Sequence, residues 1–392
     1  MHMKRVVFVG GGASSLVSAV MLKKIEPSFD IAIVEKEKKL GRKLSMTGGG
    51  KCNIAPLKDN AYVYNTSAIS LLEKTYTDIP LNRYLEILAS IGLETKTIKD
   101  YGYYPIHESA PQVVKNLFHQ INKLGIKVIY DEFIDYKNDK GLITVKLKEQ
   151  SLETEYLLFT TGGLSNEMRN VFEKHNIEVT KTYPGLCPVR TKENVSSLFG
   201  CRFEAVITLY YKKNIVKQYY GELQFKKDGL SGIPVLNLSS LISRKMLEED
   251  VNINDYQISI GLPKDFIPIL LGKTVEEALL SLFREEYASY LINKHNLNSK
   301  DIIDETLENR LSKIIRDERF TVASLYDFKD SQVSVGGVSL NQINTVFALK
   351  NEKNVYIIGE SLNVDGICGG YNLRFAITSG MIAVDSILEK AK

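Results

Sequence analysis

The sequence has little that would mark a membrane protein, a secreted protein or a metalloprotein. No stretch approaches the roughly 18 uninterrupted apolar residues of a membrane span. The N-terminus runs at once into an apolar strand and leaves no room for a signal peptide. The four cysteines form no CxxC pair, and the five histidines lack HxxxH or HExxH spacing. We therefore expect a cytoplasmic protein with no metal site.

Charge of either sign is also not concentrated anywhere. Lys and Arg number 50 against 47 Asp and Glu, which leaves a net charge of +3 spread along the chain. No basic block predicts nucleic-acid binding, and no amphipathic segment predicts a membrane anchor. Apolar residues make up 44% and charged residues 25%, the values of a soluble globular protein. At 392 residues, two or three domains are expected.

What is present begins with a βαβ pattern. Residues 5–9 form an apolar run typical of a parallel strand covered on both faces. Gly10-Gly11-Gly12 follows, then residues 13–24 with helical spacing, then a second apolar run at 31–34 closed by Glu35. The start of the chain therefore predicts a parallel sheet.

Later segments show either a helical or a strand pattern of apolar residues. The patterns predict helices at 80–92, 111–124 and 274–316, and strands within 126–150, 157–161, 205–211, 216–220 and 355–358, before a long terminal helix. The alternating strands that follow about residue 190 indicate antiparallel pairing. The fold class is therefore α/β, a doubly wound domain interrupted by a mixed β and helical insert.

The first glycine cluster fits G-x-G-x-x-G, except that Ser15 holds the third glycine place. Gly10 allows the tight turn, and Gly12 lets a pyrophosphate approach the backbone. Glu35 stands where a carboxylate accepts both ribose hydroxyls and argues against a 2′-phosphate. A plain turn with a solvated carboxylate is the alternative. NAD and FAD both remain possible here.

Two further clusters favour a flavin. The three glycines at 48–50, followed by Lys51, place backbone N–H groups against an anion or a flat ring, unless they are a surface hairpin. Residues 359–373 precede a helix whose small residues would lie close to a neighbour or a cofactor. The first turn of that helix, aimed at the flavin N1–C2=O edge, would favour the reduced ring.

With these motifs, the sequence resembles the bacterial NAD(P)/FAD-dependent oxidoreductases of the aminoacetone oxidase-like flavoprotein family, over essentially the whole chain. The resemblance is carried by GGGASS, GRKLSMTGGGKCN, LQFKKDGLSGIPVLNLS, VGGVSL and GESLNVDGICGGYNLRFA. It implies a Rossmann-like FAD-binding domain from 1–190 and 330–392, with a β-barrel and helical substrate domain inserted at 191–329.

The same resemblance implies which residues hold FAD. They are Gly10, Gly12, Ala13, Ser14, Glu35, Lys36, Arg42, Lys43, Gly49, Gly50, Cys52, Asn53, Phe133, Thr161, Gly162, Gly359, Glu360, Gly370, Asn372 and Leu373. Three positions depart from the family pattern: Ser15, Cys368 and the short segment after Gly163. Because of the last departure, the resemblance does not extend to the identity of the substrate.

A bound flavin carries the redox chemistry, so the chain need not supply a nucleophile or a metal. The sequence has no second G-x-G-x-x-G that would bind a nicotinamide dinucleotide, so we expect oxidation of a small amine with oxygen as acceptor. One alternative is NAD(P)H-dependent reduction of a C=C bond. Another is a non-catalytic redox sensor or scaffold that binds flavin. Tyr371 and Lys51 are the candidates on the substrate side. Alternatively, Tyr371 only packs on the cofactor, and Lys51 is only a surface cation. We expect His107 to be a packed, hydrogen-bonded histidine.

Overall fold

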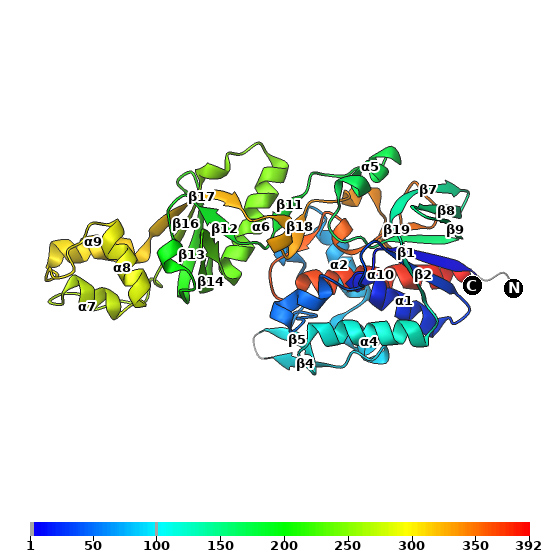
Figure 1. Cartoon of the computed structure of the whole chain (residues 1–392), viewed down its shortest axis with the longest axis horizontal. Coiled ribbons are helices and arrows are strands. Elements are labelled where there is room, and N and C mark those ends of the chain that lie inside the picture. Colours follow the sequence, from blue (N-terminus) through cyan, green and yellow to red (C-terminus); the bar gives the residue numbers. More distant parts are fainter. Residues whose placement is uncertain (1–3, 99–100) are drawn as a thin grey trace. The chain divides into compact units, whose positions relative to one another are not determined.

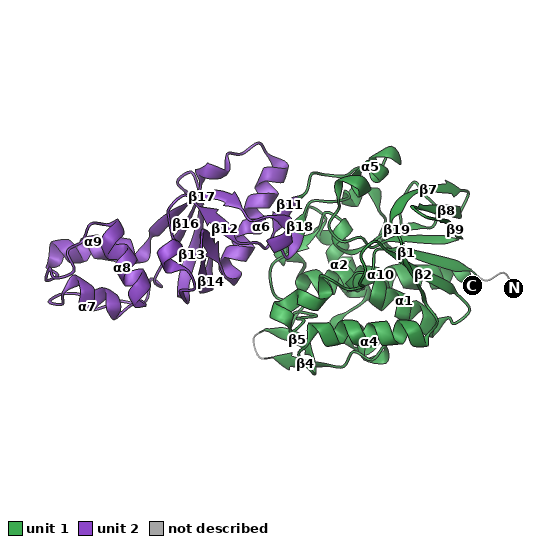
Figure 2. Ribbon diagram, in the orientation of Figure 1, with its two compact units in different colours: residues 1–182, 334–392 green, residues 183–333 purple. Residues whose placement is uncertain are grey.

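The computed structural model describes residues 4–98 and 101–392 and divides into two compact units (Figure 2). One unit comprises residues 1–182 and 334–392, and the other comprises residues 183–333. The second unit is therefore longer than the predicted insert: it begins at residue 183 rather than 191 and ends at residue 333 rather than 329. Its first strands, β11 (Tyr183–Gly185) and β12 (Val189–Thr191), are too short for an alternating pattern to show in the sequence.

The first unit is built on a five-stranded parallel sheet with the order β19-β10-β1-β2-β6 (Figure 1). Strands β1 and β2 lie side by side, and β10 flanks β1 on its other edge. The strand order therefore reverses at β1, and ligands of such sheets bind beyond the carboxyl ends of the strands at that point. The strands are β1 (Arg5–Val9), β2 (Asp30–Glu35), β6 (Lys127–Tyr130), β10 (Tyr156–Phe159) and β19 (Val355–Ile357).

Two helices distant in sequence pack side by side along this sheet. They are α1 (Ala13–Ile25) and α10 (Tyr371–Ala391), seen as the blue and red helices of Figure 1. A Cβ added to Gly380 would lie 2.1 Å from Ser18 Oγ, so only glycine allows this approach. The predicted small-residue face of the terminal helix therefore packs on α1.

Smaller elements complete this unit. A hairpin is formed by β4 (Thr95–Ile98) and β5 (Gly102–Pro105), and a three-stranded antiparallel sheet by β7 (Phe133–Asp139), β8 (Leu142–Leu147) and β9 (Ser151–Thr154). The pair of β3 (Tyr64–Asn65) and β20 (Asp365–Gly366) joins residues 300 positions apart. The remaining helices are α2 (Ile69–Asp78), α3 (Leu81–Ser90), α4 (Ala110–Lys123) and α5 (Asn166–Lys174).

The second unit contains a closed six-stranded barrel with its own core. The long hairpin of β13 and β14 pairs from Arg202 with Gln224 to Tyr211 with Asn214, as the alternating pattern predicted. The barrel strands are β12, β13 (Arg202–Tyr211), β14 (Asn214–Lys226), β15 (Gly229–Ser231), β16 (Tyr256–Gly261) and β17 (Glu318–Leu325). The helices are α6 (Ile233–Glu248), α7 (Val275–Leu280), α8 (Glu285–Lys294) and α9 (Glu305–Arg316). No helix within the described ranges is long and apolar enough to cross a bilayer.

Candidate functional site

The glycine-rich turn after β1 is closed against the end of β10. Gly10 has φ of 107°, and a Cβ there would lie 2.5 Å from the carbonyl oxygen of Thr160. The Thr160 hydroxyl donates to the Gly10 carbonyl oxygen at 2.7 Å. Both the conformation and the space therefore require glycine. This turn lies at the strand-order reversal.

Helix α1 begins directly after this turn, with Gly12 as its N-cap and Ala13 and Ser14 in its first turn. The first N–H groups of a helix have no intrahelical partner and form an anion-binding end. Ser15 is fully buried, and its hydroxyl donates to the Gly12 carbonyl oxygen at 2.9 Å. Serine is accommodated at the third glycine place because its hydroxyl is satisfied locally.

Glu35 ends β2 and turns its carboxylate toward the glycine turn. Its Oε2 accepts from the Gly11 N–H at 2.8 Å, and its Oε1 accepts from the Glu37 N–H at 2.8 Å. The carboxylate therefore shapes the turn, and it keeps lone pairs for a ribose hydroxyl. Neighbouring Lys36 is exposed.

The loop at 48–50 presents bare backbone to open space. Gly48, Gly49 and Gly50 all have positive φ, at 58°, 63° and 85°. Cβ atoms on Gly49 and Gly50 would meet nothing within 4 Å, so nothing in the described residues obstructs a ligand there. Cys52 follows with φ of 63° and a fully buried side chain.

The start of α10 packs against the residues that follow this loop. Its N-cap, Gly370, has φ of 87°, and a Cβ there would lie 2.6 Å from Asn53 Oδ1 and 2.7 Å from the Ala55 carbonyl carbon. Asn53 Oδ1 is buried and has no hydrogen-bond partner among the described residues. A Cβ on Gly102 would lie 2.9 Å from the same oxygen, so Asn53 Oδ1 is enclosed between Gly102 and Gly370.

Glu360 joins three segments at the same end of the sheet. Its Oε1 lies 3.1 Å from Lys43 Nζ and accepts from the Ser334 N–H at 2.9 Å. A Cβ on Gly162 would lie 3.6 Å from Glu360 Oε2. Thr161 Oγ1 lies 3.1 Å from Ser361 Oγ. Near them, a Cβ on Gly359 would be 3.4 Å from Ser14 Oγ.

Other predicted site residues have their side chains engaged elsewhere. The Asn372 amide bonds to the backbone N–H and carbonyl of Gly366, at 2.8 and 2.9 Å, so only its main chain is free to meet a cofactor. Leu373 is in the first turn of α10. Phe133 packs on the ring of Phe159 at 5.4 Å. Arg42 is exposed and pairs with Glu37 at 3.7 Å.

The substrate-side candidates differ in their surroundings. Lys51 is exposed, and its Nζ lies 3.4 Å from a carboxylate oxygen of Glu108. Tyr371 is half-buried at the start of α10, and burial together with the charge of Asp59 raises its pKa. Its phenol therefore keeps its proton at neutral pH. His107 is exposed, rather than packed as predicted, and its Nδ1 accepts from the Ser109 N–H at 3.2 Å.

The two thiols of these loops differ in exposure: Cys52 is buried, and Cys368 is partly exposed at the surface while most of its surroundings are protein. Burial raises the pKa of Cys52 to about 11 and that of Cys368 to about 12. Both are therefore protonated thiols at neutral pH, and neither is disulfide-bonded. Such thiols are poor nucleophiles, because the thiolate is the reactive form.

Some residues that build this region were not predicted. Thr160 and Ser361 hold the two turns together, and a buried Arg374 bonds to Asp59 beneath the start of α10. An arginine between Leu373 and Phe375, in a helix that reads as buried, is the signal that could have revealed the last pair.

These features fit a dinucleotide with a flat ring. A helix N-terminus and a carboxylate lie at the end of β1 and β2, and the backbone of Gly49 and Gly50 faces open space. The first pair suits a pyrophosphate and a ribose, and the open backbone suits a flat ring.

The family model for the HI0933-like protein Rossmann domain matches residues 4–386. The chain belongs to this family. FAD is its cofactor, and the protein is an FAD-dependent oxidoreductase by family.

Curated relatives are similar over their whole length. One is a 3-dehydro-bile acid delta(4,6)-reductase of Clostridium scindens, 22% identical over 99% of this chain and 100% of the relative. Another is a ribosomal RNA dihydrouridine synthase of Haemophilus influenzae, 24% identical over 97% and 98%.

Solved structures share the fold. A 3-ketosteroid delta1-dehydrogenase from Sterolibacterium denitrificans has a TM-score of 0.53 at 11% identity, covering 98% of this chain and 99% of its own. The E. coli quinol fumarate reductase subunit FrdA has a TM-score of 0.50 at 11% identity, covering 99% and 71%.

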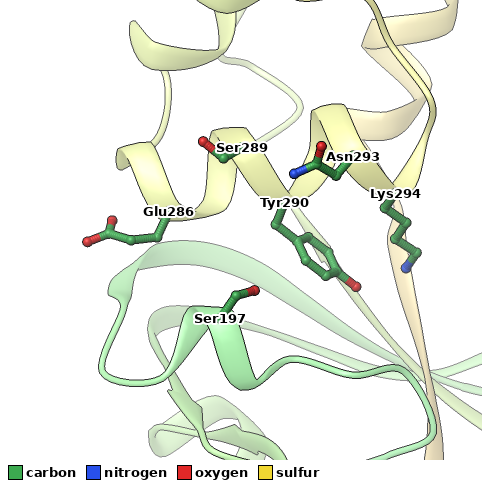
Figure 3. A pocket seen from close by; sticks show the side chains of 6 residues that line it. All are labelled: Ser197, Glu286, Ser289, Tyr290, Asn293 and Lys294. Carbon is green, nitrogen blue, oxygen red and sulfur yellow. The ribbon is translucent and has the colours of Figure 1, made fainter.

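A separate pocket of about 500 Å³ opens within the insert (Figure 3). Figure 3 shows the side chains of Tyr290 and Lys294 extending from α8 in the same direction, with the Tyr290 hydroxyl turned to the side of Lys294. Burial lowers the pKa of Lys294, but the hydrogen bond and charge of buried Glu318 outweigh it, so the pKa of this lysine is raised. None of the residues that line this groove is among the predicted FAD-binding residues. Its lining residues are Ser197, Glu286, Ser289, Tyr290, Asn293 and Lys294.

Proposed function

We propose that the protein reduces a carbon–carbon double bond conjugated to a carbonyl group in a small molecule, using NAD(P)H as electron donor. The observation that carries this proposal is that the two relatives named above, similar over nearly their full length, bear names of enzymes that saturate a carbon–carbon double bond. In the balanced reaction, the nicotinamide gives two electrons and one proton, solvent gives a second proton, and the C=C bond becomes a CH–CH bond.

FAD, when bound, would supply the redox chemistry, and the chain's own groups would hold and polarise the flavin. The first turn of α10 begins at Gly370, which packs against Asn53 and Ala55 just after the glycine loop. Its free N–H groups and the positive end of its dipole would favour added negative charge on a ring bound there.

Tyr371 is the candidate proton donor to the second carbon. It stands beside the N-cap of α10, and its raised pKa keeps the phenol protonated. A positioned acid contributes about 10²–10⁴-fold to a rate. We expect Tyr371→Phe to lower kcat by at least about tenfold with little change in KM. A rise in KM with unchanged kcat would make Tyr371 a packing residue.

Oxidation of a small amine by oxygen, the activity of the aminoacetone oxidase-like resemblance, is the second candidate. The lack of a second dinucleotide fingerprint favours it. Gly336 and Gly337 follow β18 (Val333–Val335), and Gly369 and Gly370 lie between β20 and α10. Both strands belong to two-stranded sheets, so neither glycine pair is the turn of a parallel βαβ unit that a nicotinamide would need.

Anaerobic mixing separates the two candidates. The yellow protein is mixed with NADH, NADPH or a panel of amines, and bleaching of the flavin band is followed. The protein reduced by light is then mixed with α,β-unsaturated ketones. We expect bleaching by a nicotinamide and recovery of colour by an unsaturated ketone with formation of its saturated product. Bleaching by an amine alone would reject the first candidate, and no turnover with either class would indicate a redox sensor.

A further inference from the structure

A buried ion pair ties the first turn of α10 to the segment that follows the glycine loop. The side chain of Arg374 has no solvent exposure, and its Nε and Nη2 donate to Asp59 Oδ1 and Oδ2 at 2.9 and 2.8 Å. Nη2 also donates to the Ile79 carbonyl oxygen at 2.6 Å, and Nη1 donates to the hydroxyl of Thr378. The guanidinium is thus bonded on all its edges.

Two tyrosine rings flank this cation. The guanidinium carbon of Arg374 lies 4.3 Å from the centre of the Tyr84 ring and 5.0 Å from that of Tyr76. The Tyr84 hydroxyl donates to the Ile54 carbonyl oxygen at 2.9 Å. Arg374 therefore packs on the side chain that anchors the residue next to Asn53.

A third connection reaches the main chain of α10 itself. The Tyr64 hydroxyl donates to the Tyr371 carbonyl oxygen at 2.7 Å, and the Tyr76 hydroxyl donates to that of Tyr64. The rings of Tyr64 and Tyr371 meet edge to face at 6.0 Å. One network therefore joins the segment 54–64 to the first turn of α10.

Stability alone is a weak reason for such a network. A buried ion pair is often no more stabilising than packed apolar side chains of the same volume, because both charges lose their hydration. What a bidentate, planar pair adds is a fixed geometry. Here it fixes two stretches of backbone that meet at Asn53 and Gly370.

We propose that Arg374, with Asp59 and Tyr64, is a positioning residue of the cofactor site. The network sets the spacing between the loop at 48–53 and the N–H groups of the first turn of α10. It thereby sets how closely those groups approach the flavin ring. The inference rests on the proposed placement of the ring between these two segments, but not on the identity of the substrate.

The test uses Arg374→Lys and Tyr64→Phe in the full chain, with Arg83→Ala as the control. Arg374→Lys keeps the charge and loses the planar fork, and Tyr64→Phe removes one hydroxyl. Arg83 pairs with Asp385 of the same helix at 3.0 Å, outside the buried network. The readouts are the FAD dissociation constant, the flavin midpoint potential and the circular dichroism of the flavin band.

We expect Arg374→Lys to raise the dissociation constant about tenfold, or about 1.4 kcal/mol, to make the potential more negative and to change the flavin dichroism. Tyr64→Phe should change the midpoint potential and the flavin dichroism in the same direction as Arg374→Lys, but by a smaller amount. Arg83→Ala should change neither the potential nor the dichroism. If both variants lose thermal stability but keep all three flavin properties, the network is only structural and the proposal is wrong. If Arg374→Lys does not fold, an unchanged potential and dichroism in Tyr64→Phe overturns it.

These readouts need no substrate. A wild-type protein that binds FAD but reduces no C=C bond would reject the proposed function and leave this inference intact.

Discussion

At the residue scale, Glu35 has two tasks that a mutation can separate. It accepts the Gly11 N–H at 2.8 Å, and we propose that it also accepts ribose hydroxyls of FAD. Bonds to a charged acceptor contribute about 1.5–3 kcal/mol. We expect Glu35→Ala to weaken FAD binding by about tenfold or more, measured by titrating the apoprotein. Glu35→Gln, which keeps an acceptor for Gly11 without the charge, should lose less, and unchanged affinity in both variants would remove Glu35 from the site.

The Cys52 thiol makes stability fall at high pH. Burial raises its pKa from 9.0 to about 11, so the folded state holds the proton after the unfolded state has lost it. The contribution is complete below pH 9 and is lost as the pH rises toward 11. We expect the unfolding free energy of the wild type to fall more steeply between pH 9 and 10 than that of Cys52→Ala, measured by urea denaturation. Equal slopes would show that the thiol is not shielded.

The same thiols bear on the possibility of a redox-active pair. With raised pKa values, Cys52 and Cys368 should both stay reduced during turnover. Thiol counts before and after anaerobic reduction of the flavin should be equal. A gain of two thiols would establish a disulfide that takes part in the reaction.

At the element scale, the contact between α1 and α10 depends on a missing side chain. A Cβ at Gly380 would lie 2.1 Å from Ser18 Oγ and 3.2 Å from Ile358 Cδ1. Overpacking of this kind costs about 1–3 kcal/mol, so Gly380→Ala should lower the unfolding free energy by that amount.

Ser18→Ala supplies the matched control, because Ser18 Oγ is buried and has no hydrogen-bond partner among the described residues. Ser18→Ala alone should cost little, and the double variant should recover most of the stability lost in Gly380→Ala. Strictly additive losses would show that the helices do not meet at this pair.

The start of α10 gives a prediction for the cofactor. A valine side chain at Gly370 would collide with Asn53 Oδ1 and Ala55, and it would be strained at φ of 87°. Gly370→Val should therefore lower FAD affinity or make the flavin potential more negative. Asp385→Ala, which loses an ion pair with Arg83, should leave both unchanged. Unaltered affinity, potential and turnover in Gly370→Val would place the flavin elsewhere.

Elements with a strong pattern were predictable, and short ones were not. The apolar runs of β1, β2 and β10 and the small residues of α10 were visible in the sequence, because a strand buried on both faces carries no polar residue. Helix α5 was missed because it has only nine residues and few apolar ones, although Met168 and Phe172 lie four positions apart on its buried face. Helix α6 was missed because its buried face includes serines.

At the scale of the whole molecule, the cofactor's identity followed from motifs, whereas the reaction did not. Gly10 and Gly370 have positive φ in close contacts that only glycine permits, so the sequence alone could indicate them. The pairing of Arg374 with Asp59 spans more than 300 positions and depends on tertiary packing, which no local pattern reports. Substrate choice depends on side chains that meet only in the folded protein.

The claim that both ends of the chain form one FAD site is tested most directly by the flavin itself. The purified protein is heated or acidified, and the released flavin is identified and counted against protein. The structure predicts one FAD per chain, released without proteolysis and rebound by the apoprotein. Release of FMN, or a well-folded protein that contains no flavin and does not bind added FAD, would contradict the account.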